Sequence, residues 1–141
     1  MTAQPNCKEP NVKYMLLVYV DEELLNEMSP SEFDSEMRHC LERADDLKRD
    51  GTMIDFQQLE PTTTAKTVRM RNGKLKTVDG PFAEAKEVLG GFNLIEADSM
   101  EDALRIAEGF PWVRVGSIEV RPVKDIAAVR KRVGAQEAAH A

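Results

Sequence analysis

Nine residues near the start of the chain, Val12 to Val20, are apolar at every position except Lys13. Valine and tyrosine are frequent among them, and β-branched and aromatic residues are typical of strands. Successive side chains of a strand point to opposite faces of its sheet. A strand that is apolar on both faces must be covered on both, so this segment predicts a central strand with cover above and below.

The length of 141 residues predicts one domain, with a core large enough to fold without disulfides or metals. We expect this domain at residues 12–123, after a disordered polar arm at 1–11 and before a helical extension and tail at 124–141. No apolar run is long enough to cross a bilayer, and the start of the chain does not look like an export signal. Cys7 and Cys40 lack CxxC spacing. These features predict a cytoplasmic protein with no disulfide framework, no metal site and no membrane partner.

A helix is predicted over Pro30–Asp50. Ser29 and Glu32 form a capping-box pattern around Pro30, which suits the first helical position. Gly51 can adopt the positive φ that closes a helix. The apolar residues at helical spacing, which predict one buried stripe, are Phe33, Met37, Leu41, Ala44 and Leu47.

Further strands are expected at 52–59, 62–70, 74–78, 91–97 and 115–123. Asn72-Gly73 favours a tight hairpin turn between the second and third of these, whose polar strands predict a projecting or half-exposed hairpin. Ser99 is expected to cap a helix that ends at Gly109, and a short basic helix is expected in the tail. The order strand, helix, strand, hairpin, strand, helix, strand predicts an α+β fold, namely a ferredoxin-like βαββαβ unit with an inserted β-hairpin.

Two helices can cover only one face of such a sheet, although its first strand is apolar on both. A second copy of the chain, packed sheet to sheet, would bury the remaining face. We therefore expect a homodimer, and a monomeric mass at micromolar concentration would contradict this.

The net charge of −6 disfavours a nucleic-acid partner. The charge is uneven, because residues 21–60 hold 13 acidic and 4 basic side chains, whereas residues 61–141 hold 11 acidic and 13 basic ones. The acidic part is either a solvated helix face or a surface that docks a partner. The later part could present cationic groups to an anionic ligand, and composition does not decide between these alternatives.

A rigid turn is predicted at Asp79-Gly80-Pro81-Phe82, because Gly80 allows an unusual backbone angle and Pro81 fixes the next one. Charged residues follow the turn at Glu84, Lys86 and Glu87. Acids and bases on a constrained loop can bind a polar ligand. The alternative is a surface turn with a solvated ion pair.

Three motifs also occur in the order typical of one known family. They are Lys13-Tyr14-Met15-Leu16-Leu17, then Asp79-Gly80-Pro81-Phe82-Ala83-Glu84 with Lys86-Glu87 and Leu89-Gly90-Gly91-Phe92, and finally Gly116-Ser117-Ile118-Glu119-Val120-Arg121-Pro122-Val123. Over Val12 to Val123 the chain thus resembles the DGPF-type branch of the YCII-related proteins, although Ala85 stands where members more often have threonine. The resemblance implies a dimeric α+β barrel. It implies no settled activity, since members are largely uncharacterised, some are encoded beside alternative sigma factors, and a related branch includes a dehydrochlorinase with a proposed His–Asp pair.

No such pair is expected here, because His39 faces solvent in the predicted helix and His140 lies in the tail. Asp79 is then the candidate general acid or base. Arg121, on one strand face with Ser117 and Glu119, is expected either to hold an anionic oxygen of the ligand or to pair with Glu119. The expected ligand-binding residues are Tyr14, Tyr19, Gly80, Pro81, Phe82, Lys86, Glu87 and Ser117.

These residues predict a homodimer whose cleft binds a small polar or aromatic molecule. Its chemistry would be cofactor-free acid–base catalysis of the isomerase or lyase type, with Asp79 and Arg121 as catalytic residues. The alternative is a non-catalytic binding or interaction protein, such as an accessory to transcriptional regulation.

Overall fold

The structure is a computed structural model that describes residues 12–136. The expected arm at 1–11 and His140 lie outside the described residues. The strands are β1 (Lys13–Asp21), β2 (Met53–Gln58), β3 (Lys66–Arg71), β4 (Lys74–Asp79), β5 (Glu87–Glu96) and β6 (Gly116–Pro122). The α-helices are α1 (Glu22–Glu27), α2 (Pro30–Arg49), α3 (Met100–Glu108) and α4 (Ile126–Val133), and short 3-10 helices cover Thr62–Thr64 and Pro111–Arg114.

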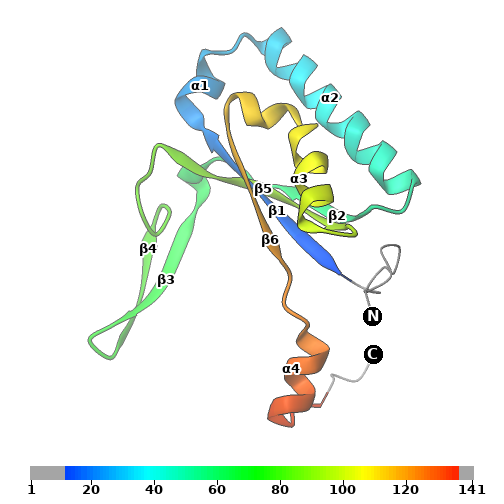
Figure 1. The fold of residues 1–141 in the computed structure, drawn as a ribbon. Helices are drawn as coiled ribbons and strands as arrows, with labels where there is room; N and C mark the ends of the chain where they lie inside the picture. The colour runs from blue at the N-terminus through cyan, green and yellow to red at the C-terminus, as the bar shows by residue number, and fades with distance from the viewer. Residues whose placement is uncertain (1–11, 137–141) are drawn as a thin grey trace, which may run out of the picture.

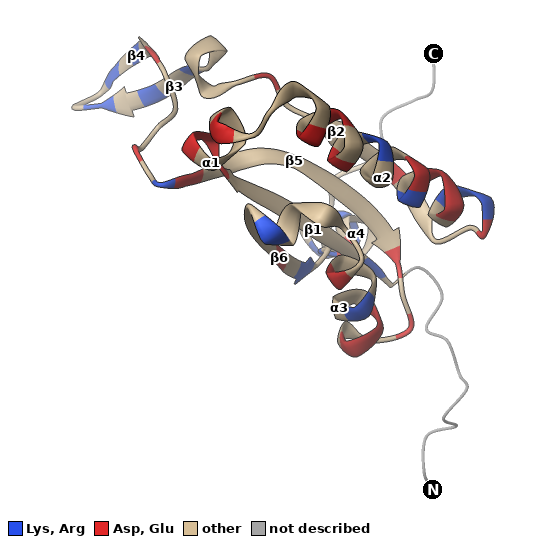
Figure 2. Cartoon of the chain, turned by 90° about the horizontal axis from the view of Figure 1, so that it is seen from above, with Lys and Arg blue, Asp and Glu red and all other residues tan. Residues whose placement is uncertain are grey.

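Four strands form an antiparallel sheet in the order β2-β5-β1-β6, and β3 pairs with β4 in a separate hairpin. Helices α2 and α3 lie on one side of the four-stranded sheet, and α4 lies apart from them, beyond its other side (Figure 1). The view from above shows acidic residues along α2 and basic residues on the hairpin (Figure 2). The mixed α+β class is therefore confirmed.

Helix α2 begins as the sequence predicts. The Ser29 hydroxyl accepts a hydrogen bond from the Glu32 amide, and the Glu32 side chain accepts one from the Ser29 amide. The buried stripe differs from the expected one at a single position, because Leu41 is 41 % exposed and Cys40 is buried in its place. Cys40 lies one helical turn before Ala44 on the face that packs on the sheet, and the 3.6-residue period rotates Leu41 away from it.

The expected hairpin is also present. Asn72 and Gly73 both have positive φ, of 51° and 74°, which the two-residue turn between β3 and β4 requires. The hairpin projects from the body of the molecule (Figure 1). Three features differ from the sequence prediction. The strand expected at 62–70 starts only at Lys66, because Thr62–Thr64 forms a 3-10 helix. Strand β5 starts at Glu87 rather than at 91, and the sequence does not predict α1, which the Asp21 side chain caps.

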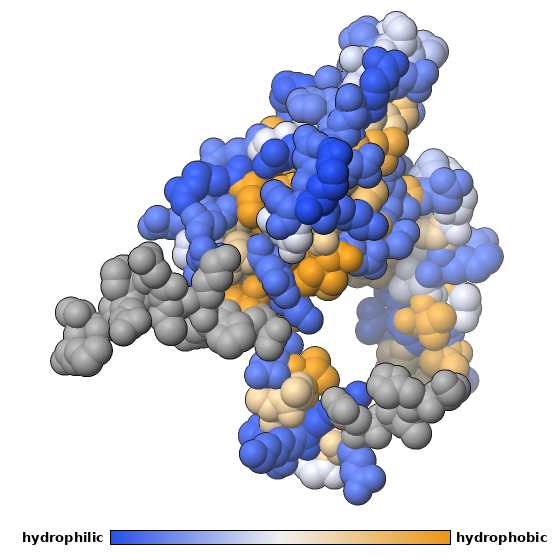
Figure 3. Space-filling model, turned by 90° about the vertical axis from the view of Figure 1, so that its right-hand side faces the viewer, coloured by the Kyte–Doolittle hydropathy of each residue, from blue (hydrophilic) through white to orange (hydrophobic). Residues whose placement is uncertain are grey.

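The strand β1 separates a buried face from a partly exposed one. Its buried residues, Tyr14, Leu16 and Val18, face the helices. Residues of β1 and β5 that pair on the opposite face, here called the open face, are Met15 with Leu94 and Leu17 with Phe92. Hydrophobic atoms also border the hollow between the body of the molecule and α4 (Figure 3). An apolar sheet face with no helix packed on it is a surface that another chain can bury.

Candidate functional site

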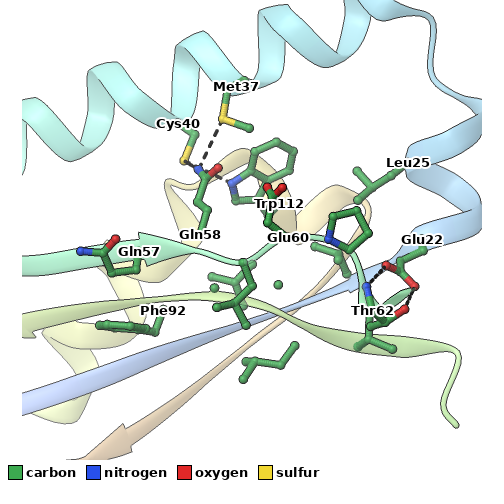
Figure 4. A pocket seen from close by; sticks show the side chains of 18 of the residues that line it. Glu22, Leu25, Met37, Cys40, Gln57, Gln58, Glu60, Thr62, Phe92 and Trp112 are labelled. Atoms are coloured by element: carbon green, nitrogen blue, oxygen red, sulfur yellow. Dashed lines mark hydrogen bonds between the residues drawn. The ribbon is translucent and has the colours of Figure 1, made fainter. Parts of the chain in front are cut away.

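A cavity of about 510 Å³ lies between α2 and the sheet, and Phe92, which the register places on the open face, is also among its lining residues. Its volume is within the range of small-molecule sites, roughly 300–1,000 Å³. The apolar side chains that line it come from β1, α1, α2, β2 and the segment before β6; they include Val18, Leu25, Phe33, Met37, Phe56 and Trp112. Figure 4 shows side chains from these elements around one space.

Gln58, at the end of β2, spans the gap between the sheet and α2 (Figure 4). Its amide nitrogen lies 3.3 Å from the Met37 sulfur and 3.8 Å from the Cys40 sulfur. The indole nitrogen of Trp112 donates to the same Cys40 sulfur at 3.2 Å. Because sulfur is a weak acceptor, the Gln58 amide keeps most of its capacity to bind a stronger partner.

The other end of the cavity is closed by a link between Glu22 and Thr62. The Glu22 carboxylate accepts from the Thr62 amide at 3.2 Å and from the Thr62 hydroxyl at 2.7 Å. Residues 59–62, which follow β2, are also held at their start, where the Leu59 amide donates to the Gly90 carbonyl at 2.8 Å. These bonds hold residues 59–62 against α1 and β5 and define the rim.

Asn93 is the most deeply buried polar side chain of the cavity. It lies on β5 opposite Leu16 and Phe56, on the face that points to α2, and is only 6 % exposed. Within residues 12–136 its carboxamide has no hydrogen-bond partner. Within residues 12–136 the fully buried side-chain atoms without a partner are Arg43 Nε and Arg69 Nε, so the amide of Asn93 is not shut off from solvent. It can therefore offer a donor and an acceptor to a ligand in the cavity.

Cys40 contributes a protected thiol to the cavity wall. Burial raises the pKa of the Cys40 thiol, and the contacts with Trp112 and Gln58 oppose that rise. The thiol therefore stays protonated at neutral pH, and only the thiolate is a good nucleophile.

We expect native Cys40 to react with a disulfide reagent at pH 8 at least about tenfold more slowly than in urea. A Cys7→Ser variant, which leaves Cys40 as the only cysteine, isolates the signal. Because the pKa is raised, the native rate should still rise above pH 9. A native rate equal to the unfolded rate would contradict the buried position.

The expected turn at Asp79 lies at the base of the hairpin. The Asp79 carboxylate is 87 % exposed and pairs with Lys66 at 2.6 Å. Gly80 has the positive φ predicted for it, 90°, and Phe82 is 78 % exposed, with its carbonyl accepting from Arg69 at 3.0 Å. In this chain the turn therefore ties the two hairpin strands together, and Pro81 lies within it.

Four of the other predicted residues come together where β1 ends. Lys86 lies 4.0 Å from the buried carboxylate of Asp21, and the Ser117 hydroxyl donates to Glu87 at 2.7 Å. Tyr19 pairs with Ser117 in the sheet. A lysine and two carboxylates thus lie close together at this end of the sheet.

The last predicted residues lie on different faces. Arg121 is 3.9 Å from Glu119, which is the pairing that the sequence left open as an alternative, and both lie on the open face. Tyr14 is buried on the opposite face. No contact within residues 12–136 joins Arg121 to Asp79, and none of the ten predicted site residues lines the cavity.

Sequence reasoning did not identify the residues that line the cavity. Gln58 and Trp112 are far apart in the sequence and meet at Cys40 only through the fold. One signal was present: Asn93 interrupts the otherwise apolar run Gly91 to Ile95 at a position of the buried face.

Within the described residues, no cluster of three or more histidine, cysteine, aspartate or glutamate side chains could hold a metal ion. His39 is exposed, as expected. No helix found between residues 12 and 136 is long and apolar enough to cross a membrane.

Comparison with known proteins gives two matches. An uncharacterized protein of Rhizobium meliloti (strain 1021) is 37 % identical over 112 residues, which cover 78 % of this chain and 90 % of that protein. The YCII-related domain family matches residues 12–127, from the start of β1 into α4. The chain therefore belongs to the YCII-related family.

Proposed function

We propose that this protein is a homodimer that binds a small molecule in the cavity between α2 and the sheet. The observation that carries the proposal is Asn93, a residue only 6 % exposed that lines the cavity and whose carboxamide makes no hydrogen bond within residues 12–136. Apolar surroundings with few, fixed polar groups are typical of ligand sites, because the walls supply affinity and the polar groups orient the ligand.

The same proposal includes the quaternary structure. The strand order β2-β5-β1-β6, with both helices on one side, supports a ferredoxin-like unit. The apolar open face supports pairing of two such units, sheet to sheet, into a dimeric α+β barrel. The sequence Asp79-Gly80-Pro81-Phe82 supports placement in the DGPF-type branch, and the unpaired thiol of Cys40 supports a cytoplasmic location.

Acid–base catalysis by Asp79 and Arg121 stays a prediction. Within one chain both residues are solvent-exposed and pair with Lys66 and Glu119, respectively. Arg121 lies on the open face, so a dimer would bring a second chain against it. Binding in the cavity requires neither residue, and it is the function that the geometry supports better.

The test is the variant Asn93→Leu. A leucine of similar size breaks no hydrogen bond within residues 12–136, so the free energy of unfolding should fall by less than about 1 kcal/mol, whereas fragment binding should be lost. Urea unfolding gives the first quantity. Fragment binding is measured by thermal unfolding, as the increase in melting temperature when each member of a library of small polar and aromatic fragments is added to wild type or variant.

A residue kept only for structure would behave in the opposite way. A less stable Asn93→Leu variant that shows the same fragment-induced shifts as wild type would contradict the proposal. Glu42→Gln, an exposed change on α2 outside the cavity, is the control and should leave both measurements unchanged.

A further inference from the structure

We propose that the cavity, if it binds ligands as argued above, selects a protonated amine attached to an aromatic or branched aliphatic body, and disfavours a carboxylate or phosphate on the same body. This assigns a ligand class to a site for which the sequence suggested only a small polar or aromatic molecule. Three separate observations support this ligand class: the charge of the cavity lining, its unused acceptors and its apolar walls.

The charge of the lining is negative. Two acids, Glu22 and Glu60, line the cavity, and no lysine, arginine or histidine is among the described lining residues. Lys48 approaches one lining ring, with its ammonium 5.7 Å from the centre of Phe56, but does not itself line the space. An anion bound here would leave water without gaining a cationic partner, which is costly.

The two acids differ in how many of their hydrogen-bond acceptor sites are still free. Glu22 already accepts two hydrogen bonds from Thr62. Glu60 makes no ion pair and no side-chain hydrogen bond with residues 12–136. Its side chain is among those drawn around the cavity, on the same side of the strands as Gln58 (Figure 4). Glu60 is therefore the carboxylate that can pair with a ligand cation at the rim.

Two further unused acceptors line the cavity, one on the buried residue Asn93 and one on the exposed residue Gln58. The side-chain oxygens of Asn93 and Gln58 receive no hydrogen bond from residues 12–136. An ammonium group has three donors and no acceptor, so it matches amide oxygens and a carboxylate. Hydrogen bonds to a charged group are about twice as strong as neutral ones, which favours the protonated amine over an alcohol.

The walls suit the remainder of such a ligand. The rings of Phe33 and Trp112 lie 6.1 Å apart, tilted by 39°, and Val18 and Leu25 add aliphatic surface. A flat apolar body can pack against these side chains, and an ammonium near an aromatic face gains further attraction.

The test uses three probes with one body: 2-phenylethylamine, 2-phenylethanol and phenylacetate. By calorimetry at pH 7, the amine should bind at least about tenfold more tightly than the alcohol, and phenylacetate more weakly than both. Glu60→Gln should weaken the amine about tenfold and change the alcohol less than about twofold. The Glu42→Gln control should bind all three probes as wild type does.

Phenylacetate binding as tightly as the amine, or an amine affinity unchanged by Glu60→Gln, would overturn the assignment of the ligand class. Either result would leave the cavity as a binding site. If neither these probes nor the fragment library bound at all, the proposed function would fail together with the ligand class.

Discussion

Leu17→Glu is expected to convert the proposed homodimer into a monomer at micromolar concentration. Leu17 lies at the centre of the open face, on a central strand and opposite Phe92. In a sheet-to-sheet dimer this substitution would bury two symmetry-related carboxylates without partners, each at a cost of several kcal/mol. The measurement is molar mass by light scattering or sedimentation equilibrium.

The matched control places the same charge on an exposed leucine elsewhere. Leu104 lies on α3 and is 45 % exposed, so Leu104→Glu should leave the molar mass at the dimer value. Circular dichroism should show that Leu17→Glu keeps its helices and strands. A wild-type protein that is monomeric under these conditions would contradict the dimer, whatever the variant does.

Gly91→Ala is expected to lower the free energy of unfolding by about 2 kcal/mol and to abolish binding in the cavity. A Cβ atom at Gly91 would lie 2.6 Å from the Gln57 carbonyl oxygen and 3.2 Å from the Gln58 Cα, so β2 would have to move away from β5. Overpacking of this kind costs roughly 1–3 kcal/mol. The displacement would also shift Gln58, which spans the cavity.

The neighbouring glycine is the control. Gly90 is the extra residue of a bulge, because Val18 pairs with Gly91 and Tyr19 pairs with Leu89. A Cβ there would meet a Val20 methyl group at 3.1 Å, which can yield more easily than backbone. Gly90→Ala should therefore cost less than half as much in urea unfolding. Equal effects of the two substitutions would contradict the argument from strand spacing.

Local signals predicted most of the fold. The capping box at Ser29 and Glu32 defined the start of α2, and Asn72-Gly73 defined the hairpin turn. Both depend on residues within a few positions of each other, so no tertiary contact is needed to recognise them. The nearly continuous apolar character of β1 also indicated correctly that it is a central strand.

The cavity could not be predicted in the same way, because its polar groups come from segments that only tertiary folding brings together. The acidic segment illustrates this. Its charge was consistent with a solvated face, yet it also supplies Glu22 and Glu60 to the rim. The later, more basic part, which was considered as a site for an anionic ligand, contributes no cationic side chain to the cavity.

For the turn at Asp79–Phe82, in contrast to the cavity, the sequence indicated a functional site that a single chain does not form. Its unusual sequence suggested a reactive loop around Asp79, whereas in one chain the turn joins the strands of the hairpin and Asp79 pairs with Lys66. An acid, a glycine and a proline in sequence define a backbone shape. These three residues do not define which surface the turn faces. A partner chain would be needed to enclose the turn in a site.

The most direct measurement is a nuclear magnetic resonance titration of ¹⁵N-labelled protein with 2-phenylethylamine, in which side-chain amides and the indole report separately. We expect saturable shifts at the amide of Asn93, at the amide of Gln58 and at the indole N–H of Trp112, which all lie in the cavity. Saturable shifts confined to the hairpin around Asp79 and to Arg121, with the three cavity groups unchanged, would contradict binding between α2 and the sheet.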